Sequence, residues 1–364
     1  MKSLNQLIIT LMACLFSIQA WAQSGKLFNT DNQLSSNLAT QVFQDKSGFI
    51  WIATRNGLNT YDGYHITVMK KDMSNFLGLK SNYINSIAQD DKGHILLGTN
   101  NSLLEFTGSE FHKIPMLDSK GEELATYVKQ VYPLKNKDVA VATSGYGIMI
   151  KKKDAQECHA MKGEVEKLKY IHKLLEDKRG RLWIITEDGK LYRKETNGRV
   201  TSHFVGTEGV DAQDIQQDVL GNLYLASKNQ GVHLLRAGSN VFTRISSIGN
   251  LPIETIYISR NNKLYIGCDG LGIYVYDPQT GFLQDNPLFS RLVNLAKSKV
   301  TSIIEDNQGN IWVSMLQKGV FMQSNIQNDF NYMGFRLGSR NVIGENCVTS
   351  LSINQGNQVW VGTD

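Results

Sequence analysis

One short pattern recurs along the chain at nearly constant spacing, and it limits the folds that the chain can adopt. A turn residue is followed three positions later by an aromatic or branched residue, as in Gly48 and Trp51 (DKSGFIWIAT). The turn residues of the first seven copies lie 45, 43, 44, 41, 41 and 47 residues apart. They are Gly48, Gly93, Asn136, Gly180, Gly221, Asn262 and Gly309. A period in the low forties is typical of a β-propeller, with one four-stranded blade per repeat.

Each copy also carries the local signals of strands and turns. Residues 300–306 (VTSIIED) alternate apolar and polar side chains and end on an acid. A tight turn follows, in which Gly or Asn supplies a positive φ, and then a strand with an aromatic residue, 311–315 (IWVSM). A Gly-containing loop leads to a third strand, 319–323. Alternation broken by turns every eight to twelve residues indicates strands rather than helices.

Residues 26–29 (KLFN) indicate how the ring closes. They resemble the outer strand of a repeat, such as 110–114 (EFHKI), yet they precede the first inner strand. We therefore expect this N-terminal strand to complete the seventh blade. Residues 329–335 would then serve as an outer strand of a second ring, which begins with strands 346–353 and 358–362.

The predicted architecture is all-β, with a boundary near the end of the seventh repeat. Residues 23–326 are expected to form a seven-bladed β-propeller of four-stranded antiparallel blades. Residues 327–364 are expected to be the first strands of a second propeller, which is incomplete. An eighth copy of the repeat (NQGNQVWVGTD) ends the chain and supports this division.

The first 22 residues have the features of an export signal. Lys2 is their only charge, residues 7–18 are largely apolar, and Ala20, Trp21 and Ala22 form a small-x-small cleavage site. We predict a signal peptide at 1–22 and a periplasmic mature chain. A lipoprotein signal ending at Cys14 is the alternative. The apolar run is too short to span a membrane comfortably, and no later segment reaches 18 apolar residues.

The charge and the cysteines exclude several classes of function. Removing Lys2 with the signal leaves 37 basic and 34 acidic side chains, a net charge of +3. So mild a charge does not favour a nucleic-acid partner. Cys158, Cys268 and Cys347 are odd in number and widely spaced, so we expect small buried side chains rather than a disulfide framework.

No catalytic or cofactor motif stands out. The chain has no phosphate loop or dinucleotide fingerprint, and none of its seven histidines shows the spacing of zinc ligands, so we predict no cofactor and no metal. Adjacent acids at 90–91, 122–123 and 187–188 point apart on strands or loops, which does not suit shared-proton chemistry; they are expected in solvated loops. The basic run 151–153 is expected in a solvated turn.

The repeated residues are expected to be structural, because seven copies cannot each be an active site. They should cap the turns and fill the space between blades, where each buried aromatic contributes about 1.5–3 kcal/mol before entropy is counted. These residues are Asp45, Gly48, Trp51, Gly93, Gly180, Trp183, Gly221, Gly309, Trp312 and Trp360.

Candidate ligand-binding residues lie in other loops. A propeller usually binds its ligand in the central funnel on one face, where loops join the second strand to the third. Amide, basic and aromatic side chains in these loops suit sugar hydroxyls and uronate or sulfate groups. The candidates are Arg55, Asn56, Asn100, Asn101, Tyr146, Glu187, Asp188, Lys228, Asn229, Asp269, Gln317 and Lys318.

Residues 34–63 (LSSNLATQVFQDKSGFIWIATRNGLNTYDG) resemble the two-component regulator propeller repeat family. Such proteins are typically hybrid two-component sensors, with two seven-bladed propellers and an immunoglobulin-like domain in the periplasm. A membrane helix and a histidine kinase follow. The resemblance implies a module that senses oligosaccharides from polysaccharide breakdown and controls genes for glycan use. The kinase is absent from these 364 residues, so we expect no catalysis by this chain.

Three hypotheses follow. The first is a periplasmic sensor module whose partners are an oligosaccharide, a second propeller and an immunoglobulin-like domain, with a homodimer as an additional contact. The second is a non-catalytic protein-binding or spacer propeller. The third is a propeller glycan lyase or hydrolase, which requires catalytic acids, a His or a Tyr converging in the funnel.

Overall fold

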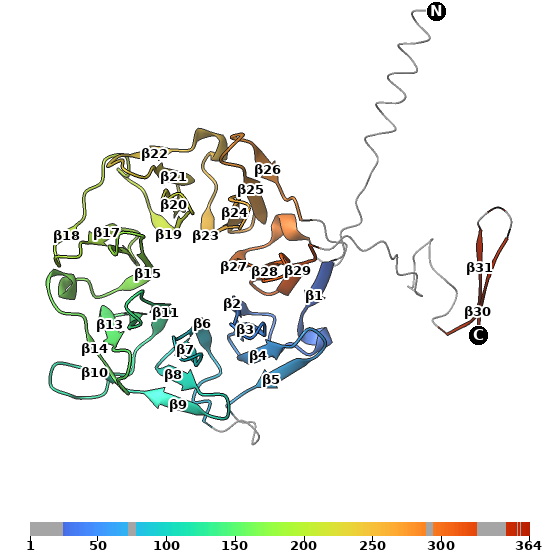
Figure 1. The fold of residues 1–364 in the computed structure, drawn as a ribbon, viewed down its shortest axis with the longest axis horizontal. Coiled ribbons are helices and arrows are strands. Elements are labelled where there is room, and N and C mark those ends of the chain that lie inside the picture. Colours follow the sequence, from blue (N-terminus) through green and yellow to red (C-terminus); the bar gives the residue numbers. More distant parts are fainter. Residues whose placement is uncertain (1–24, 72–77, 289–293, 326–346, 355, 357) are drawn as a thin grey trace, which may run out of the picture. The chain divides into compact units, whose positions relative to one another are not determined.

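The computed structural model describes residues 25–71, 78–288, 294–325, 347–354, 356 and 358–364. It divides into two compact units, and the larger of them covers Gly25–Asn325. This unit is a ring of seven antiparallel β-blades (Figure 1). No α-helix occurs among the described residues. The prediction of an all-β seven-bladed propeller is therefore confirmed.

Each blade begins with an inner strand beside the central channel and continues outward through three further strands, each antiparallel to the one before (Figure 1). We number the blades 1 to 7 by their inner strands. The inner strands are β2 (Ala39–Gln44), β6 (Ile84–Gln89), β11 (Val128–Pro133), β15 (Ile171–Glu176), β19 (Ala212–Gln217), β23 (Ile253–Ile258) and β27 (Val300–Glu305). The second strands are β3 (Ile50–Thr54), β7 (Ile95–Thr99), β12 (Val139–Thr143), β16 (Leu182–Thr186), β20 (Leu223–Ser227), β24 (Leu264–Cys268) and β28 (Ile311–Met315).

The third strands are β4 (Gly57–Tyr61), β8 (Leu103–Phe106), β13 (Ile148–Lys151), β17 (Leu191–Lys194), β21 (Val232–Leu235), β25 (Ile273–Tyr276) and β29 (Gly319–Gln323). The outer strands are β5 (Ile66–Met69), β9 (Phe111–Ile114), β14 (Cys158–Ala160), β18 (Val200–Thr201), β22 (Phe242–Arg244), β26 (Leu283–Asp285) and β1 (Gly25–Phe28). Blade 3 has a fifth strand, β10 (Met116–Leu117), which pairs in parallel with β14.

Short 3₁₀ helices lie in the connections between strands. They are η1 (Thr30–Asn32), η2 (Glu164–Lys167), η3 (Ser246–Ile248) and η4 (Leu295–Lys297). Among the residues that the structure describes, no helix is long and apolar enough to cross a membrane.

The N-terminal strand closes the ring, as its sequence predicts. Strand β1 pairs antiparallel with β29, and Phe28 lies opposite Val320. The Phe28 ring is fully buried; its centroid lies 5.2 Å from that of Trp312 in blade 7 and 4.9 Å from that of Tyr61 in blade 1. The junction between the last and first blades is thus held by a strand pairing and an aromatic cluster.

The repeated Asp and Trp residues share one geometry. The Asp45 carboxylate accepts hydrogen bonds from the backbone N–H groups of Ser47 and Phe49, and from Trp51 Nε1 at 2.8 Å. Trp183 and Trp312 donate to Asp177 and Asp306 in the same way, at 2.9 and 2.8 Å. One carboxylate therefore caps the turn and orients the indole that is buried beside the next blade.

Blade 3 departs from the predicted register by one residue. The positive φ falls on Lys137 (71°), and the Lys137 N–H donates to the Leu134 carbonyl at 2.9 Å. Asn136 is therefore not the equivalent of Gly48, and Ala140 rather than Val139 lies in the position of Trp51. The physical reason is that Leu134 replaces the turn acid, while the carboxylate of Asp138 accepts from Asn136 and Lys152 instead.

Adjacent inner strands are linked by side chains that accept hydrogen bonds from the backbone of the next blade. Ser86 Oγ accepts from the Val131 N–H at 3.0 Å, and Asp214 Oδ2 from the Ile256 N–H at 3.1 Å. Ser302 of blade 7 accepts from Val42 of blade 1 at 3.4 Å, so the same kind of link spans the closure.

The second unit includes an antiparallel hairpin of β30 (Val348–Ile353) and β31 (Val359–Thr363), in which Trp360 is exposed. That this hairpin begins a second propeller stays a prediction. The predicted signal peptide and strand 329–335 lie outside the described residues. The expectation of buried cysteines is wrong for Cys347, which is exposed. Cys158 and Cys268 are buried, and burial raises the pKa of both thiols to about 12.

Candidate functional site

A belt of polar residues surrounds one end of the central channel. In every blade the pairing between the inner and second strands skips the second residue of the inner strand, for example between Ala39 and Gln41. Such a β-bulge re-aims a side chain. All seven bulged residues are polar, and we call them the mouth belt: Thr40, Asn85, Lys129, His172, Gln213, Glu254 and Thr301. The loops from second to third strands gather at the same end of the blades.

The belt residue His172 lies among positively charged side chains. Burial, and then the charge of the adjacent Lys173, lower the pKa of His172 to about 4. Lys173 Nζ lies 3.2 Å from Asp214 Oδ1. Lys129 and Lys228 add further positive charge near the imidazole, and only Asp214 opposes them. The imidazole is therefore neutral at pH 7 and available as a hydrogen-bond donor and acceptor.

We expect His172 to make stability depend on pH. An unfolded His has a pKa of about 6.5. Between about pH 6.5 and pH 4 the unfolded chain binds a proton that the folded chain does not. Stability therefore falls as pH falls through that window, and the residue contributes nothing above it. In denaturant titrations, His172→Gln should lose less stability than the parent between about pH 7.5 and pH 5. The exposed His112, changed to Gln, should leave the parent's pH dependence intact.

A group of aromatic and charged residues crosses the mouth from blade 1 to blade 4. We call Arg55, Tyr83, Tyr127, Lys129 and Glu187 the mouth array. The Arg55 guanidinium carbon lies 5.4 Å from the Tyr83 ring centroid, and the Tyr83 and Tyr127 centroids are 6.0 Å apart, edge to face. Lys129 Nζ lies 4.8 Å from the Tyr127 centroid and 3.4 Å from Glu187 Oε1.

The array is held in place by its surroundings. The Tyr127 hydroxyl donates to Asn85 Oδ1 at 2.7 Å, and the Ser144 hydroxyl donates to Glu187 at 2.7 Å. Burial first, and then the neighbouring Tyr83 hydroxyl, raise the pKa of Tyr127, so its phenol stays neutral. Arg55 is exposed, and no carboxylate in the described part of the chain lies within ion-pair distance of it. Its guanidinium is therefore open to an anionic ligand.

Several candidate loop residues use their polar groups to shape the loops. Asn100 Oδ1 accepts from the Ser81 hydroxyl at 2.8 Å, and Asn101 accepts from Thr99 at 3.1 Å. Asn229 accepts a hydrogen bond from the Asp211 N–H and donates one to the Gly209 carbonyl, in the loop that leads into β19. Lys318 Nζ donates to two carbonyls and to a Ser hydroxyl. These four side chains do not converge with the mouth array.

The other loop candidates differ in their surroundings: one is ion-paired and four are exposed. Asp269 pairs with Lys299 at 2.8 Å, and Lys299 also pairs with the belt residue Glu254 at 2.7 Å. Burial lowers the pKa of Lys299, but the hydrogen bonds that it donates to these two acids outweigh the burial and raise the pKa overall. The remaining loop candidates, Asn56, Tyr146, Lys228 and Gln317, are exposed.

Asp188 lines a separate pocket between blades 4 and 5. The pocket has a volume of about 540 Å³, and Tyr192, His203 and Asp211 also line it. Asp188 pairs with Lys190 at 2.7 Å, and that hydrogen bond is the main cause that lowers the pKa of the acid. Gly189, in this wall of the pocket, has a φ of 74°, a backbone conformation that favours glycine.

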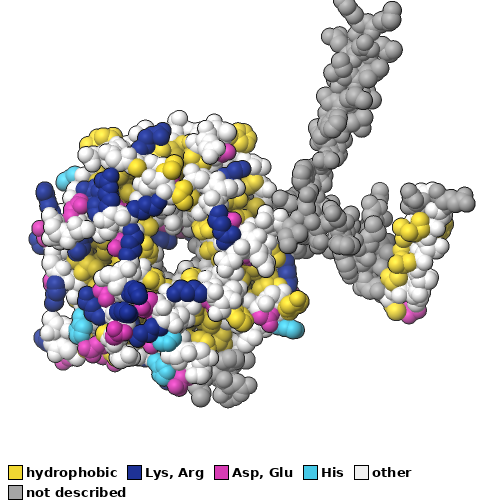
Figure 2. Space-filling model, in the orientation of Figure 1, with side chains coloured by type: hydrophobic (Ala, Val, Ile, Leu, Met, Phe, Trp, Pro, Cys, Tyr) yellow, Lys and Arg dark blue, Asp and Glu magenta, His cyan; other side chains and the backbone are white. Residues whose placement is uncertain are grey.

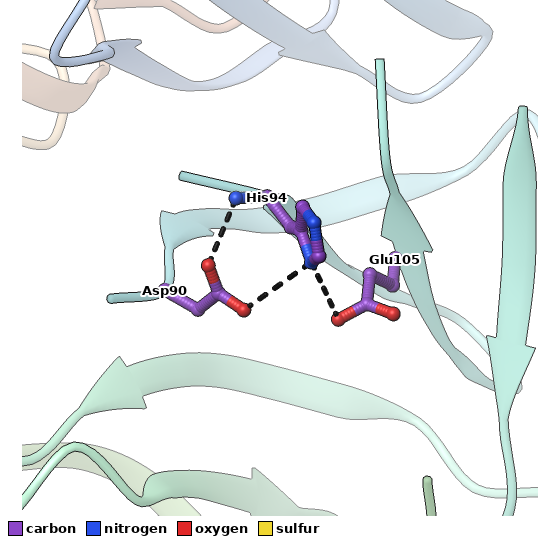
Figure 3. Close-up of side chains that lie close together, drawn as sticks. All are labelled: Asp90, His94 and Glu105. Carbon is purple, nitrogen blue, oxygen red and sulfur yellow. Dashed lines mark hydrogen bonds and ion pairs between the residues drawn. The ribbon is translucent and has the colours of Figure 1, made fainter. Parts of the chain in front are cut away.

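A second cluster lies at the turn end of blade 2, away from the mouth. Figure 3 shows the His94 ring between the carboxylates of Asp90 and Glu105. The expectation that Asp90 and Lys151 are solvated is wrong. Asp90 is 4% exposed because it caps the turn, and Lys151 is 4% exposed beside Glu105, with 3.9 Å from Nζ to Oε1. Sequence spacing does not reveal this cluster, since its members come from a turn and from the third strand of the blade.

Basic side chains are spread around the central opening on the face that Figure 2 draws, with acidic side chains among them. Sequence reasoning identified Arg55 and Glu187 but missed Tyr83, Tyr127, Lys129 and His172. Tyr83 and Tyr127 lie two residues before the bulge of an inner strand, and Lys129 and His172 are themselves bulged residues. An alignment of the seven repeats at the start of the inner strand would have identified them.

Three segments of the chain match a family model described as two component regulator propeller, over residues 33–56, 78–101 and 294–317. Each segment runs from the loop before an inner strand to the loop after the second strand, in blades 1, 2 and 7. No curated protein matches the chain significantly.

Among solved structures, the chain is similar to extracellular domains of two putative hybrid two component systems from B. thetaiotaomicron. For BT3049 the identity is 22% and the TM-score 0.74, over 94% of this chain and 47% of that one. For BT4673 the values are 15% and 0.70, over 93% and 46%. The chain thus spans about half the length of these two domains.

An enzyme shares the fold at lower identity. Virginiamycin B lyase from Staphylococcus aureus is 13% identical with a TM-score of 0.65, over 83% of this chain and 99% of the lyase. Likeness at this identity concerns the fold alone. Three of the seven blades thus contain segments that match the two component regulator propeller model, and the chain shares the seven-bladed ring with these structures.

Proposed function

We propose that this chain is the periplasmic ligand-sensing module of a hybrid two-component sensor. It binds an oligosaccharide derived from a polysaccharide at the channel mouth and performs no catalysis itself. A second propeller, an immunoglobulin-like domain and a kinase outside this chain pass the signal on to genes for glycan use. The regulator propeller repeats and the fold shared with extracellular sensor domains support this role.

The mouth array is the observation that carries the ligand class. The array offers two half-buried tyrosine rings at 6.0 Å, and the exposed Arg55 lies over one of them without an acidic partner among the described residues. Aromatic faces stack on the apolar face of a sugar ring, and a guanidinium binds carboxylate or sulfate oxygens through two parallel hydrogen bonds. Acidic oligosaccharides therefore suit this mouth better than neutral ones.

A thermal-shift panel tests the proposal. The purified chain is melted with acidic and neutral oligosaccharides, and a ligand at about a hundred times its dissociation constant should stabilise the chain by about 2.7 kcal/mol. Arg55→Met should abolish the shift given by an acidic sugar, since it removes the charge but keeps an apolar stem over Tyr83. Lys113→Met, on an outer strand, is the matched control and should retain the shift.

The outcomes separate the three hypotheses. No shift with any sugar, from a chain that melts cooperatively, contradicts binding at this ring and favours the spacer or protein-binding propeller. Turnover of a glycan would favour the lyase or hydrolase. If Arg55→Met retains the ligand-induced rise in melting temperature, the ligand site lies outside the mouth array.

A further inference from the structure

We propose that Asp90, His94 and Glu105 in blade 2 form a divalent-cation site suited to Zn²⁺. Asp90 directly follows the inner strand β6, His94 precedes the second strand β7, and Glu105 lies on the third strand β8. Figure 3 shows both carboxylates directed at the imidazole. This site is independent of the sugar-binding role, because it lies at the opposite end of the blade from the mouth array.

Two of the three separations between the ligand atoms fit zinc. His94 Nδ1 lies 3.3 Å from Glu105 Oε1 and 3.6 Å from Asp90 Oδ2, and all three atoms lie within 4.8 Å of one another. Two ligands bound to zinc at about 2.0–2.1 Å and at a tetrahedral angle lie about 3.3–3.4 Å apart. The two measured edges are close to that value. The His94 side chain is 31% exposed, which leaves room for a water as the fourth ligand.

The other blades show what is missing at Asp90. In blades 1, 4 and 7 the second oxygen of the turn carboxylate accepts a hydrogen bond from a Trp indole. In blade 5 the same oxygen of Asp218 accepts from Asn222 at 2.7 Å. Leu96 occupies the Trp position in blade 2, and no hydrogen bond within the described residues reaches Asp90 Oδ2. An oxygen of a 96% buried carboxylate is thus directed at the cluster without a hydrogen-bond donor.

Glu105 is the second unusual feature. Its strand position lies opposite the second-strand residue in the Trp place, and blade 2 alone has an acid there. The residues at this position in blades 1 and 3 to 7 are Thr60, Ile150, Arg193, Leu234, Val275 and Met322. Glu105 is 7% exposed, and among the described residues its carboxylate lies within ion-pair distance of His94 and Lys151 only.

The charges of the cluster favour a bound cation. Two buried carboxylates face a single buried ammonium, that of Lys151, so one negative charge lacks a buried counterion. Burying an unpaired charge is costly, and a divalent cation removes that cost. Asp90 Oδ1 accepts from the backbone N–H groups of Lys92 and His94, which fixes the direction of Oδ2 before any ion binds. The mixed nitrogen and oxygen ligands favour Zn²⁺ over Mg²⁺ and Ca²⁺, which prefer oxygen alone.

Metal titration of the purified chain tests the site. After treatment with a chelator, the chain should take up one equivalent of Zn²⁺ in calorimetry, and its melting temperature should rise with Zn²⁺ but not with Mg²⁺ or Ca²⁺. His94→Asn should weaken zinc binding by more than about tenfold. Mutating a residue that only hydrogen-bonds to a metal ligand already lowers metal affinity by about 10- to 100-fold. This variant should fold, since Asn222 and Asn310 occupy the equivalent position in blades 5 and 7.

Two further variants make the result specific. Glu105→Gln should also weaken zinc binding, whereas His112→Asn, at an exposed histidine on the outer strand of the same blade, should leave it unchanged. Lys151→Met should raise the affinity several-fold, because it removes a competing positive charge. Failure to bind zinc at micromolar concentration would overturn the proposal. Binding that survives His94→Asn would overturn it equally.

Discussion

Phe28→Ala should lower the free energy of unfolding by about 3–5 kcal/mol, the range for truncating a fully buried Phe. The ring of Phe28 is enclosed by Trp312 of blade 7 and Tyr61 of blade 1, with centroids at 5.2 and 4.9 Å. It also belongs to the strand that closes the propeller, so the cavity opens where the first and last blades meet. The first and last blades of the propeller are joined to each other by noncovalent contacts at this junction.

Denaturant unfolding followed by tryptophan fluorescence measures this effect, because Trp51, Trp183 and Trp312 are buried in the folded ring and become exposed when it unfolds. Phe282→Ala is the matched control: that side chain is 65% exposed, and the change should shift stability by no more than about 0.5 kcal/mol. Equal losses from the two substitutions would show that β1 does not stabilise the ring as its packing implies.

Asp177→Ala should also destabilise the chain, by about 3–5 kcal/mol, because it removes one partner of a buried charge pair. The carboxylate accepts from Trp183 Nε1 at 2.9 Å, from Arg181 Nε at 2.7 Å and from two backbone N–H groups of the turn. Asp177 and Trp183 are both fully buried. Truncation therefore leaves several buried donors without an acceptor and releases the indole from its orientation.

The loss should depend on pH with a defined sign. Burial by itself raises the pKa of Asp177, but hydrogen bonds from Trp183, the Arg181 backbone and the Arg181 guanidinium outweigh it and lower the pKa below its ordinary value. The carboxylate therefore contributes its full stability above about pH 4, the pKa of an unfolded Asp, and loses it as pH falls through the folded pKa. Unfolding curves of parent and variant should converge in acid.

An exposed acid provides the control for this prediction. Asp154 pairs with Lys92 on the surface at 3.2 Å and is 76% exposed in its side chain, so Asp154→Ala should leave stability nearly unchanged at every pH. Asp177→Asn keeps one acceptor oxygen and should lose less than the Ala variant. A parallel offset of the Asp177→Ala and parent curves from pH 7 into acid would contradict the lowered pKa.

Local sequence determined the ring. Each turn acid, turn glycine and following Trp lies within seven residues of chain, so short-range hydrogen bonds repeat the same hairpin wherever the pattern occurs. Seven of the eight repeats form blades, because the predicted closing strand at residues 26–29 pairs with the seventh. Blade 3 was displaced by one residue for the same reason, since Leu134 lacks the carboxylate that marks the start of the turn.

Tertiary structure alone decided the two sites. Arg55, Tyr127 and Glu187 belong to different blades and meet only because the ring sets the distance between neighbouring sheets. Asp90, His94 and Glu105 meet because strand register places Glu105 opposite Leu96, where the missing indole leaves room for an imidazole and a second acid. Neither set has a characteristic spacing in the sequence. Sequence determines what is local and repeated, whereas contacts between blades depend on the register and packing of segments far apart in the chain.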